Sequence, residues 1–444
     1  MEVEVRVVQF VLLLSVLSSI SCAAQSQPQP QQTAQDNAAS SEQRMMPGMT
    51  MSADSLIELT EMHSTAGTGA EPNSTPFSML MSTHGAWTFM FHGVGFLNYT
   101  QTTGPRGQDK VFSTNWIMPM AQRRVGGGTL TLRTMLSFEP ATVTERQYPL
   151  LFQQGETAFG KAIVDGQHPH DFFMELAAIY DYPIGERTLL SFYAAPVGDP
   201  ALGPVAFPHR HSASENPVAA LGHHLEDSTH IANEVVTLGI THSIFRLEAS
   251  GFHGREPDEY RWNIDSGAID SWATRVTVNP GRNWSMQYSV ADLHSPEALF
   301  PDENLRRMTA SVMYNLPLHR GNWASTLVWG RNQSLTDGNV GNGYLAESTL
   351  QFKNKNYAWT RIENVDRTNE LLVGDNPFPP GFQEKYFTRV QAYTLGYDRD
   401  IGRIPHLSTA IGGEVILYGV PDVLKNAYGS HPATVVLFLR LRPR

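Results

Sequence analysis

The chain has 444 residues, of which 17% are charged and 41% are hydrophobic, and its formal net charge is −11 at pH 7. This acidic balance gives no support for nucleic-acid binding, because nucleic acids are bound by basic surfaces. A single cysteine, Cys22, also leaves no disulfide framework to read from the sequence. Nucleic acid is therefore not an expected partner.

Residues 1–24 have the pattern of an export signal. Arg6 precedes an apolar run over residues 7–20, and small residues at 21–24 are typical of a cleavage site. The run is too short to span a membrane, and no later stretch is long and apolar enough for a transmembrane helix. Cleavage at the end of this segment would leave the mature chain without cysteine. A lipoprotein acylated at Cys22 is the alternative, although the residues before it make a poor lipobox.

Residues 25–85 are predicted to form a flexible periplasmic prefix. Residues 25–44 are rich in Gln, Pro and Ser and carry too little apolar surface to fold. Residues 64–85 are again rich in Gly, Ser and Thr. The remaining residues, 86–444, are then expected to form one folded domain.

From residue 86 onward, short segments with alternating polarity predict β-strands. In one of them Trp272 and Val276 lie on one face, whereas Arg275 and Thr277 lie on the other. Strands of this kind are expected at 86–100, 109–120, 128–138, 170–182, 188–197, 229–240, 244–254, 270–280, 284–292, 306–316, 322–331, 344–353, 357–366, 387–398, 407–419 and 433–443.

The connections between these strands alternate between short and long. Tight connections are expected at 121–127, 183–187, 241–243, 281–283, 317–321, 354–356 and 399–406. Long ones are expected at 139–169, 198–228, 255–269, 293–305, 332–343, 367–386 and 420–432, with a shorter one at 101–108. Transmembrane barrels sort their connections this way, with tight turns on the periplasmic side. We therefore predict an all-β fold, a transmembrane antiparallel up-and-down β-barrel of about sixteen strands.

The export signal, the unfolded prefix and the alternating strands resemble a Gram-negative outer-membrane β-barrel (porin-like) protein over residues 86–444. The resemblance implies a location in the outer membrane, contact with its lipid, and the option of a homo-oligomer. One departure is the last strand, since such barrels usually end in an aromatic residue and this sequence ends Leu441-Arg-Pro-Arg444. Aromatic residues near strand ends suit the interfacial girdles of such barrels. They are Trp87, Tyr99, Trp284, Trp323, Trp329, Tyr344 and Trp359.

Charged residues are assigned to the inner face of the barrel. An Arg or Lys that faces lipid at mid-depth costs about 2–4 kcal/mol, so these residues are expected to line the lumen. Sixteen strands enclose a lumen wide enough for an aqueous channel unless loops plug it. A basic lining would favour anions, and the alternative is a set of cross-strand charge ladders that hold the wall. The expected lumen residues are Arg133, Arg246, Glu248, Arg275, Glu347, Lys353, Arg361, Glu363, Arg389, Arg440 and Arg442.

Histidines are concentrated in, or at the base of, two predicted extracellular loops, in HPHD and HRHSASENPVAALGHHLEDSTH. Imidazoles two residues apart on an extended segment point the same way, and Glu226 and Asp227 add carboxylates. This set would suit Zn²⁺ or Cu²⁺, although its spacing matches no defined zinc signature. One alternative is that these histidines are neutral and form hydrogen bonds with the rim of the barrel. Another is that they sense pH. The histidines are His168, His170, His209, His211, His223, His224 and His230.

Methionines form a second cluster of metal-ligand type. Met45, Met46, Met49 and Met51 offer thioethers without competing oxygen ligands, which favour Cu(I). A Met-containing prefix ahead of a barrel resembles the B-type outer-membrane copper-resistance proteins, which usually carry several Met/His repeats where this chain has one clear cluster. The alternative is a short docking segment. No cofactor is required by these patterns, and Cu or Zn are the metals that the donors would take.

Little in the sequence indicates an enzyme. It contains no Gly-x-Ser-x-Gly, P-loop or HExxH motif. Asp227, Ser228 and His230 supply the residue types of a hydrolase, but neighbours on a strand point to opposite faces and form no triad. We expect an outer-membrane channel for small solutes, linked to metal handling, with histidine-rich loops at its mouth. A copper- or zinc-binding resistance protein that does not conduct, and a barrel hydrolase, are the alternatives.

Overall fold

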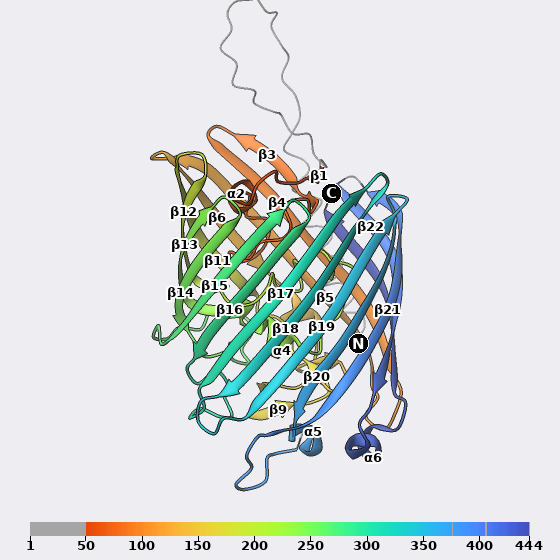
Figure 1. The fold of residues 1–444 in the computed structure, drawn as a ribbon. Helices are drawn as coiled ribbons and strands as arrows, with labels where there is room; N and C mark the ends of the chain where they lie inside the picture. The colour runs from red at the N-terminus through yellow and green to blue at the C-terminus, as the bar shows by residue number, and fades with distance from the viewer. Residues whose placement is uncertain (1–49, 375, 405, 444) are drawn as a thin grey trace, which may run out of the picture. The chain divides into compact units, whose positions relative to one another are not determined.

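The computed structural model describes residues 50–374, 376–404 and 406–443. The predicted signal, the first part of the predicted prefix (residues 25–49), and with it Met45, Met46 and Met49, lie outside these residues. The described chain forms a closed antiparallel β-barrel (Figure 1). Its long strands are β4 (Trp87–Thr102), β5 (Asp109–Val125), β6 (Gly128–Leu136), β11 (Phe173–Ile184), β12 (Thr188–Gly198), β13 (Ala232–His242), β14 (Phe245–His253), β15 (Ser271–Gly281), β16 (Trp284–Leu293), β17 (Leu305–Leu318), β18 (Gly321–Ser334), β19 (Val340–Phe352), β20 (Asn356–Thr368), β21 (Tyr386–Ile404), β22 (Leu407–Gly419) and β23 (Ala433–Pro443).

Shorter elements lie before and between these strands. No helix among the described residues is both long and apolar enough to cross a membrane. The short strands are β1 (Thr50–Met51), β2 (Phe77–Ser78), β3 (Leu80–His84), β7 (Tyr148–Pro149), β8 (Glu156–Ala158), β9 (Lys161–Ile163) and β10 (Gly166–Gln167). The helical elements are α2 (Leu56–Met62), α3 (Glu139–Thr142), α4 (His223–Glu226), η2 (Ser228–His230), α5 (Glu370–Val373), η3 (Asp422–Leu424) and α6 (Lys425–Tyr428).

All sixteen predicted strands are present, and the prediction of a sixteen-strand antiparallel barrel is confirmed. Several strands run a few residues beyond their predicted ends. The connection expected at 332–343 therefore shrinks to 335–339, and the one expected at 399–406 shrinks to a turn after Ile404. The alternation of tight and long connections remains.

The barrel closes between its first and last long strands. β23 pairs with β4 in antiparallel register, with Leu437 opposite Tyr99 and Leu441 opposite Gly95. The short strand β3 pairs with the other end of the same edge of β4, with Leu80 opposite Phe91. β4 is thus covered along its length by two separate partners.

Strict alternation separates the two faces of the wall. On β15, Trp272 and Val276 face outward and are exposed, whereas Arg275 and Thr277 face inward and are buried. Trp284, Trp323, Tyr344 and Tyr99 also lie on the outer face, as girdle residues would. Trp359 does not, because its indole points inward and donates to Glu414 Oε2 at 2.9 Å. Its assignment to a girdle was wrong.

Residues 52–79, which we name the N-terminal insert, are folded rather than free. Ser55 caps α2 through Oγ, which accepts from the Glu58 amide at 3.2 Å, and His63 ends the helix with φ 46°. Most side chains after α2 are buried. The prediction of a flexible prefix as far as residue 85 therefore differs from the structure. Its Gly/Ser/Thr composition, which resembled that of a linker, suits the lumen because the polar partners of the insert lie there.

Two long connections also turn inward. We name residues 137–172 the first lumen loop and residues 199–231 the second lumen loop, and most of their side chains are buried. The helix α4, which belongs to the second lumen loop, contacts β18 and β19, beside which it is labelled in Figure 1. The histidines of both loops thus lie inside the barrel, not at an open mouth.

Candidate functional site in the barrel lumen

The N-terminal insert is bound to the barrel wall by polar contacts. Arg133 on β6 donates to the carbonyls of His63, Thr65 and Gly67 at 3.2, 2.6 and 2.5 Å. Asn315 on β17 donates to the Ser74 carbonyl at 2.8 Å. The insert therefore reaches from β6 to β17, and its backbone polar groups find partners on both strands.

The arginines of the wall are also paired with carboxylates. Arg133 Nε lies 2.6 Å from Glu175 Oε2, and both side chains are almost fully buried. Arg275 Nε lies 3.0 Å from Glu248 Oε2 and Arg246 Nε lies 3.2 Å from Glu248 Oε1. These contacts fit the predicted cross-strand ladders, since β14 and β15 are neighbours. A buried arginine needs such a partner, because an unpaired charge inside a protein is costly.

The second lumen loop supplies partners that the sequence did not reveal. Its Arg210 lies 2.6 Å from Glu347 on β19, whose other oxygen lies 3.2 Å from Arg361 on β20. The same Arg210 lies 3.0 Å from Asp227 within the loop. Glu363 accepts from the Gly222 amide at 3.2 Å. The wall charges therefore hold the loop in place instead of facing an open aqueous pore.

The closing strand is tied to the same loop. Arg442 lies 2.9 Å from Glu215 Oε1, and Arg440 also contacts the Glu215 carboxylate. Arg440 lies 2.9 Å from Asp398 and 2.6 Å from Asp400 on β21. Both arginines face the lumen, as the alternation of β23 indicated.

Two predicted lumen residues lie elsewhere. Arg389 is on the outer face of β21, paired with Asp366 at 2.6 Å and stacked over the ring of Tyr344. The reason is the register of β21, which turns Val390 inward and leaves Val390 0% exposed. Lys353 is exposed in the tight turn between β19 and β20, where it has φ 52°. Both lumen assignments were wrong.

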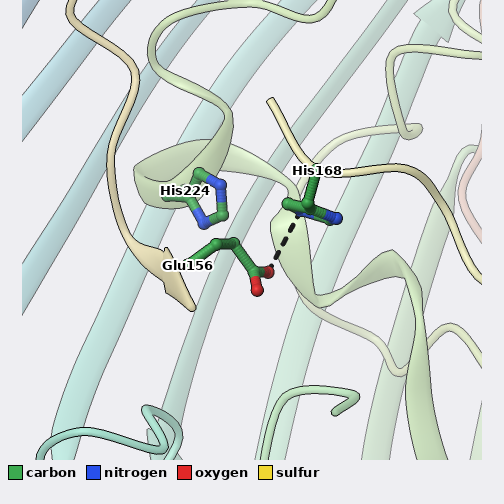
Figure 2. Close-up of side chains that lie close together, drawn as sticks. All are labelled: Glu156, His168 and His224. Carbon is green, nitrogen blue, oxygen red and sulfur yellow. Dashed lines mark ion pairs between the residues drawn. The ribbon is translucent and has the colours of Figure 1, made fainter. Parts of the chain in front are cut away.

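Glu156, His168 and His224 come together inside the barrel (Figure 2). One potential ligand atom from each lies within 4.8 Å of the other two, and His168 Nε2 is 3.1 Å from Glu156 Oε1. Glu156 comes from β8, His168 from the chain just after β10, and His224 from α4. Two histidines and a carboxylate are a ligand set that Zn²⁺ or Cu²⁺ accepts, with a remaining position for water.

The hydrogen bonds of this group favour a cation between its members. The ring of His168 has Nδ1 2.9 Å from the Pro169 carbonyl, so Nδ1 carries the proton and donates. Nε2 then faces the Glu156 carboxylate and needs a proton or a metal ion there, since two lone pairs repel. His224 Nδ1 has no hydrogen-bond partner among the described residues. Burial, followed by the charge of His223, holds the pKa of His224 well below its usual value, which leaves a neutral imidazole.

Carboxylates near this group show the effect of burial. Burial alone would raise the pKa of Glu156, but His168 and Arg261 lower it below its usual range. Burial and the charge of Glu156 raise the pKa of Glu256 to about 8. Arg261 Nη2 lies 3.4 Å from Glu156 and competes with any metal ion for this carboxylate.

Three more of the predicted histidines pack around Phe207, which lies 5.1 to 6.1 Å from their rings between centroids. His170 Nδ1 lies 2.9 Å from Glu139, His223 Nδ1 lies 2.5 Å from Asp227, and His230 Nδ1 lies 2.8 Å from the Asp227 carbonyl. Their Nδ1 atoms are thus occupied by protein acceptors. His223 also lies 5.2 Å from His224 between ring centroids, so five predicted histidines converge in one cluster.

His209 and His211 do not join this cluster. Residues 207–209 form a turn, with the His209 amide bonded to the Ala206 carbonyl at 2.9 Å, so the expectation of an extended segment with parallel imidazoles was wrong. His209 Nε2 lies 3.2 Å from Met135 Sδ. The His211 amide donates to Glu71 at 2.9 Å. Met51 lies in β1, apart from both, and pairs there with Phe77 of β2.

The site includes acids that the sequence did not single out. Glu156 precedes His168 by twelve positions, and Glu139 precedes His170 by thirty-one; neither interval has a recognised ligand signature. Their location in the same loop as HPHD was the available signal. For the hydrolase alternative, Ser228 Oγ accepts from Arg307 at 2.8 Å, and no hydrogen bond joins it to His230 in the described part of the chain. These residues do not form a triad.

The comparisons with known proteins agree on the fold. No family model matches the sequence, and no curated protein does. The anion-selective porin from Comamonas acidovorans is similar in structure, with a TM-score of 0.51, 11% identity, and coverage of 80% of this chain and 99% of the porin. OmpF of Salmonella typhi, solved with daunomycin, has a TM-score of 0.49 and 9% identity over 81% of this chain and 100% of OmpF. The fold is that of a porin-like barrel.

Proposed function

We propose that the protein is an outer-membrane channel for small solutes, closed by its own internal segments and regulated by metal binding in the lumen. The observation that carries this proposal is the position of Glu156, His168 and His224, which join the two lumen loops. Glu156 and His168 belong to the first lumen loop and His224 to the second. A metal ion held by all three would fasten one loop to the other.

The polar contacts of the filling support the view that it can move. The insert and the loops form ion pairs and hydrogen bonds with the wall, which water can replace when the segments leave. They also share apolar clusters with the wall, and exposure of this surface on opening would favour the closed state at rest. The wall left behind would carry Arg133, Arg275 and Arg361 into the water-filled lumen together with their partners Glu175, Glu248 and Glu347, so the charge of this lining would be mixed.

Metal binding is expected to stabilise the closed state. A ligand shifts an equilibrium only by its difference in affinity between two states, and separation of the loops would dismantle this ligand set. Zn²⁺ or Cu²⁺ would then reduce the open probability. We expect the permeant to be a small solute or a metal ion. The only other partner that we expect is the lipid of the outer membrane.

Single-channel recording of the refolded chain in planar bilayers tests the proposal. We expect discrete open steps whose frequency falls when Zn²⁺ is added and recovers with a chelator. The Glu156→Gln variant should keep the steps and lose the response to Zn²⁺. His431→Asn is the matched control, because His431 is an exposed loop histidine that is not part of this ligand set.

The outcomes separate the two parts of the proposal. A silent bilayer from a folded, heat-modifiable barrel would refute the channel and favour the non-conducting copper- or zinc-binding protein, which the deep burial of the lumen charges also supports. Open steps whose frequency does not change with Zn²⁺ in the unaltered protein would refute metal regulation but would still support a channel. Lipid or peptide turnover by the folded barrel would instead favour the hydrolase.

A further inference from the structure

One part of the barrel wall differs from the rest of the lumen in its chemistry. Six methionines are buried there in a single cluster, and each is at most 7% exposed. Trp116 and residues of α2 pack against or within the same cluster. Elsewhere the inner wall carries Arg, Glu, Asn, Ser and Thr side chains together with clusters of aliphatic and aromatic residues. The methionines are Met79, Met90, Met118, Met120, Met135 and Met174.

The strand register places a histidine among these thioethers. His92 on β4 lies directly opposite Met118 on β5, and Met90 lies opposite Met120 two residues away. All four face inward and are buried. Directly opposed residues of an antiparallel pair have Cβ atoms about 4.5–5.5 Å apart, so the side chains of His92 and Met118 are neighbours.

The second lumen loop brings another histidine to the same place. His209 Nε2 lies 3.2 Å from Met135 Sδ, and its ring centroid lies 5.8 Å from that of His92. The indole of Trp116 packs against both rings, at 4.3 Å from His209 and 5.2 Å from His92. The two imidazoles and the Met135 thioether therefore lie together beside Trp116, and Met118 lies opposite His92 in the strand register.

These imidazoles are available as ligands. His92 Nε2 is buried and has no hydrogen-bond partner in the part of the chain that the structure describes. His209 presents Nε2 to the Met135 thioether at 3.2 Å. Methionine alone often fills gaps in a core, but such packing does not account for a buried imidazole nitrogen left without a partner.

We propose that Met118, Met135, His92 and His209 form a binding site for a soft monovalent metal ion, Cu(I) or Ag(I). Thioether and imidazole ligands without a carboxylate select such ions over Zn²⁺, Ca²⁺ or Mg²⁺. A single positive charge also suits a buried site that offers no anionic ligand. This site is separate from the Glu156 group and stands whether or not the barrel conducts.

Titration of the folded full-length barrel with Ag⁺, and with Cu⁺ against a chromogenic chelator, tests this site. We expect one ion per chain, with affinity reduced roughly tenfold or more in Met118→Leu/Met135→Leu, as expected when ligands are lost. Met-to-Leu changes usually cost under about 1.5 kcal/mol of stability, so the variant should fold. Met313→Leu is the control, because Met313 is an equally buried methionine on β17 outside the cluster.

A second variant separates this site from the methionines of the prefix. Leucine at Met45, Met46, Met49 and Met51 should leave the high-affinity ion in place, and Glu156→Gln should do the same. Unchanged Ag⁺ affinity in the Met118→Leu/Met135→Leu barrel, or loss of the ion only in the prefix variant, would overturn the proposal. If the double variant does not fold, the X-ray absorption spectrum of Cu⁺ bound to Met135→Leu decides, since the sulfur shell must shrink relative to the unaltered protein.

Discussion

On β23, Val435 and Leu437 face outward and are 42% and 57% exposed, whereas Arg440, a few residues further on, faces inward and is 1% exposed. The same contrast runs along β15. In a water-soluble protein the charged residues lie on the exposed face, whereas here they lie on the buried one. The lumen filling therefore includes a polar core, in which specificity comes from ion pairs and hydrogen bonds, beside apolar clusters of wall and loop residues. The outer face requires only apolar surface.

The largest expected effect is the difference in the free energy of unfolding between two Arg→Ala substitutions, one on each face of the wall. Arg133→Ala should lower the free energy of unfolding by about 3–5 kcal/mol, because it leaves Glu175 buried without its partner and three insert carbonyls without a donor. Arg389→Ala on the outer face should cost about 0–1 kcal/mol, because its side chain is 42% exposed. Urea unfolding in lipid vesicles measures both. Equal losses would refute the contrast between the faces.

A charge introduced on the outer face should be nearly as harmful as a charge removed from the inner face. Leu437→Arg, near the middle of β23, should destabilise the barrel by about 2–4 kcal/mol, since it places a guanidinium in lipid. Leu437→Ala keeps the face apolar and should have a smaller effect. The folded fraction on heat-modifiability gels reports the difference, and tolerance of Arg at this position would show that β23 does not face lipid at mid-depth.

A ligand bound to the polar core should stabilise the barrel. Zn²⁺ at one hundred times its dissociation constant adds about 2.7 kcal/mol to a folded state that alone binds it. Glu156→Gln should remove most of that gain, measured against its own stability in chelator, which the loss of the ion pairs with His168 and Arg261 will lower. The urea midpoint with Zn²⁺ and with chelator measures the gain, which should be the same in His431→Asn as in the unaltered protein.

The smallest effect concerns pH. Burial and the charge of Arg442 lower the pKa of His211 to about 4. Below the unfolded value of about 6.5 the unfolded chain gains a proton that the folded chain does not, so stability is lost as the pH falls from about 6.5 to 4. His211→Asn should remove about 1 kcal/mol of this loss, a modest value because the ring is partly exposed and solvent screens its charge. An unchanged pH profile of the urea midpoint would contradict this assignment.

The outer face could be predicted from the sequence because its rule is local. Alternation alone placed Trp272, Val276 and Leu437 outward, and all sixteen strands followed. Arg389 was misplaced because Phe387 and Val390 are apolar on opposite faces at the start of β21, where alternation no longer tells the faces apart. The pairing of β21 with β20, which places Asp366 opposite Arg389, fixes the register and therefore the face on which Arg389 lies.

The contents of the lumen could not be predicted in the same way. The contacts of the N-terminal insert, such as Gly67 with Glu175 and Ser74 with Asn315, span more than one hundred positions. Its composition is that of a linker, because a polar lumen selects polar and small residues. The histidines were found by their density, yet His209 and His224 lie in different environments because turns within the second lumen loop set their directions. The fold could thus be predicted from the sequence, whereas the grouping of the site residues could be predicted only in part.

The contact of Glu215 with Arg440 and Arg442 bears on how the barrel seam acquires its register. A slip of one residue between β23 and β4 would turn both arginines toward lipid and bring Leu439 and Leu441 to the carboxylate. Such a product would combine a buried, unpaired acid with two cations in hydrocarbon. The contact of Glu215 with these two arginines therefore favours the native register at the seam over a register shifted by one residue.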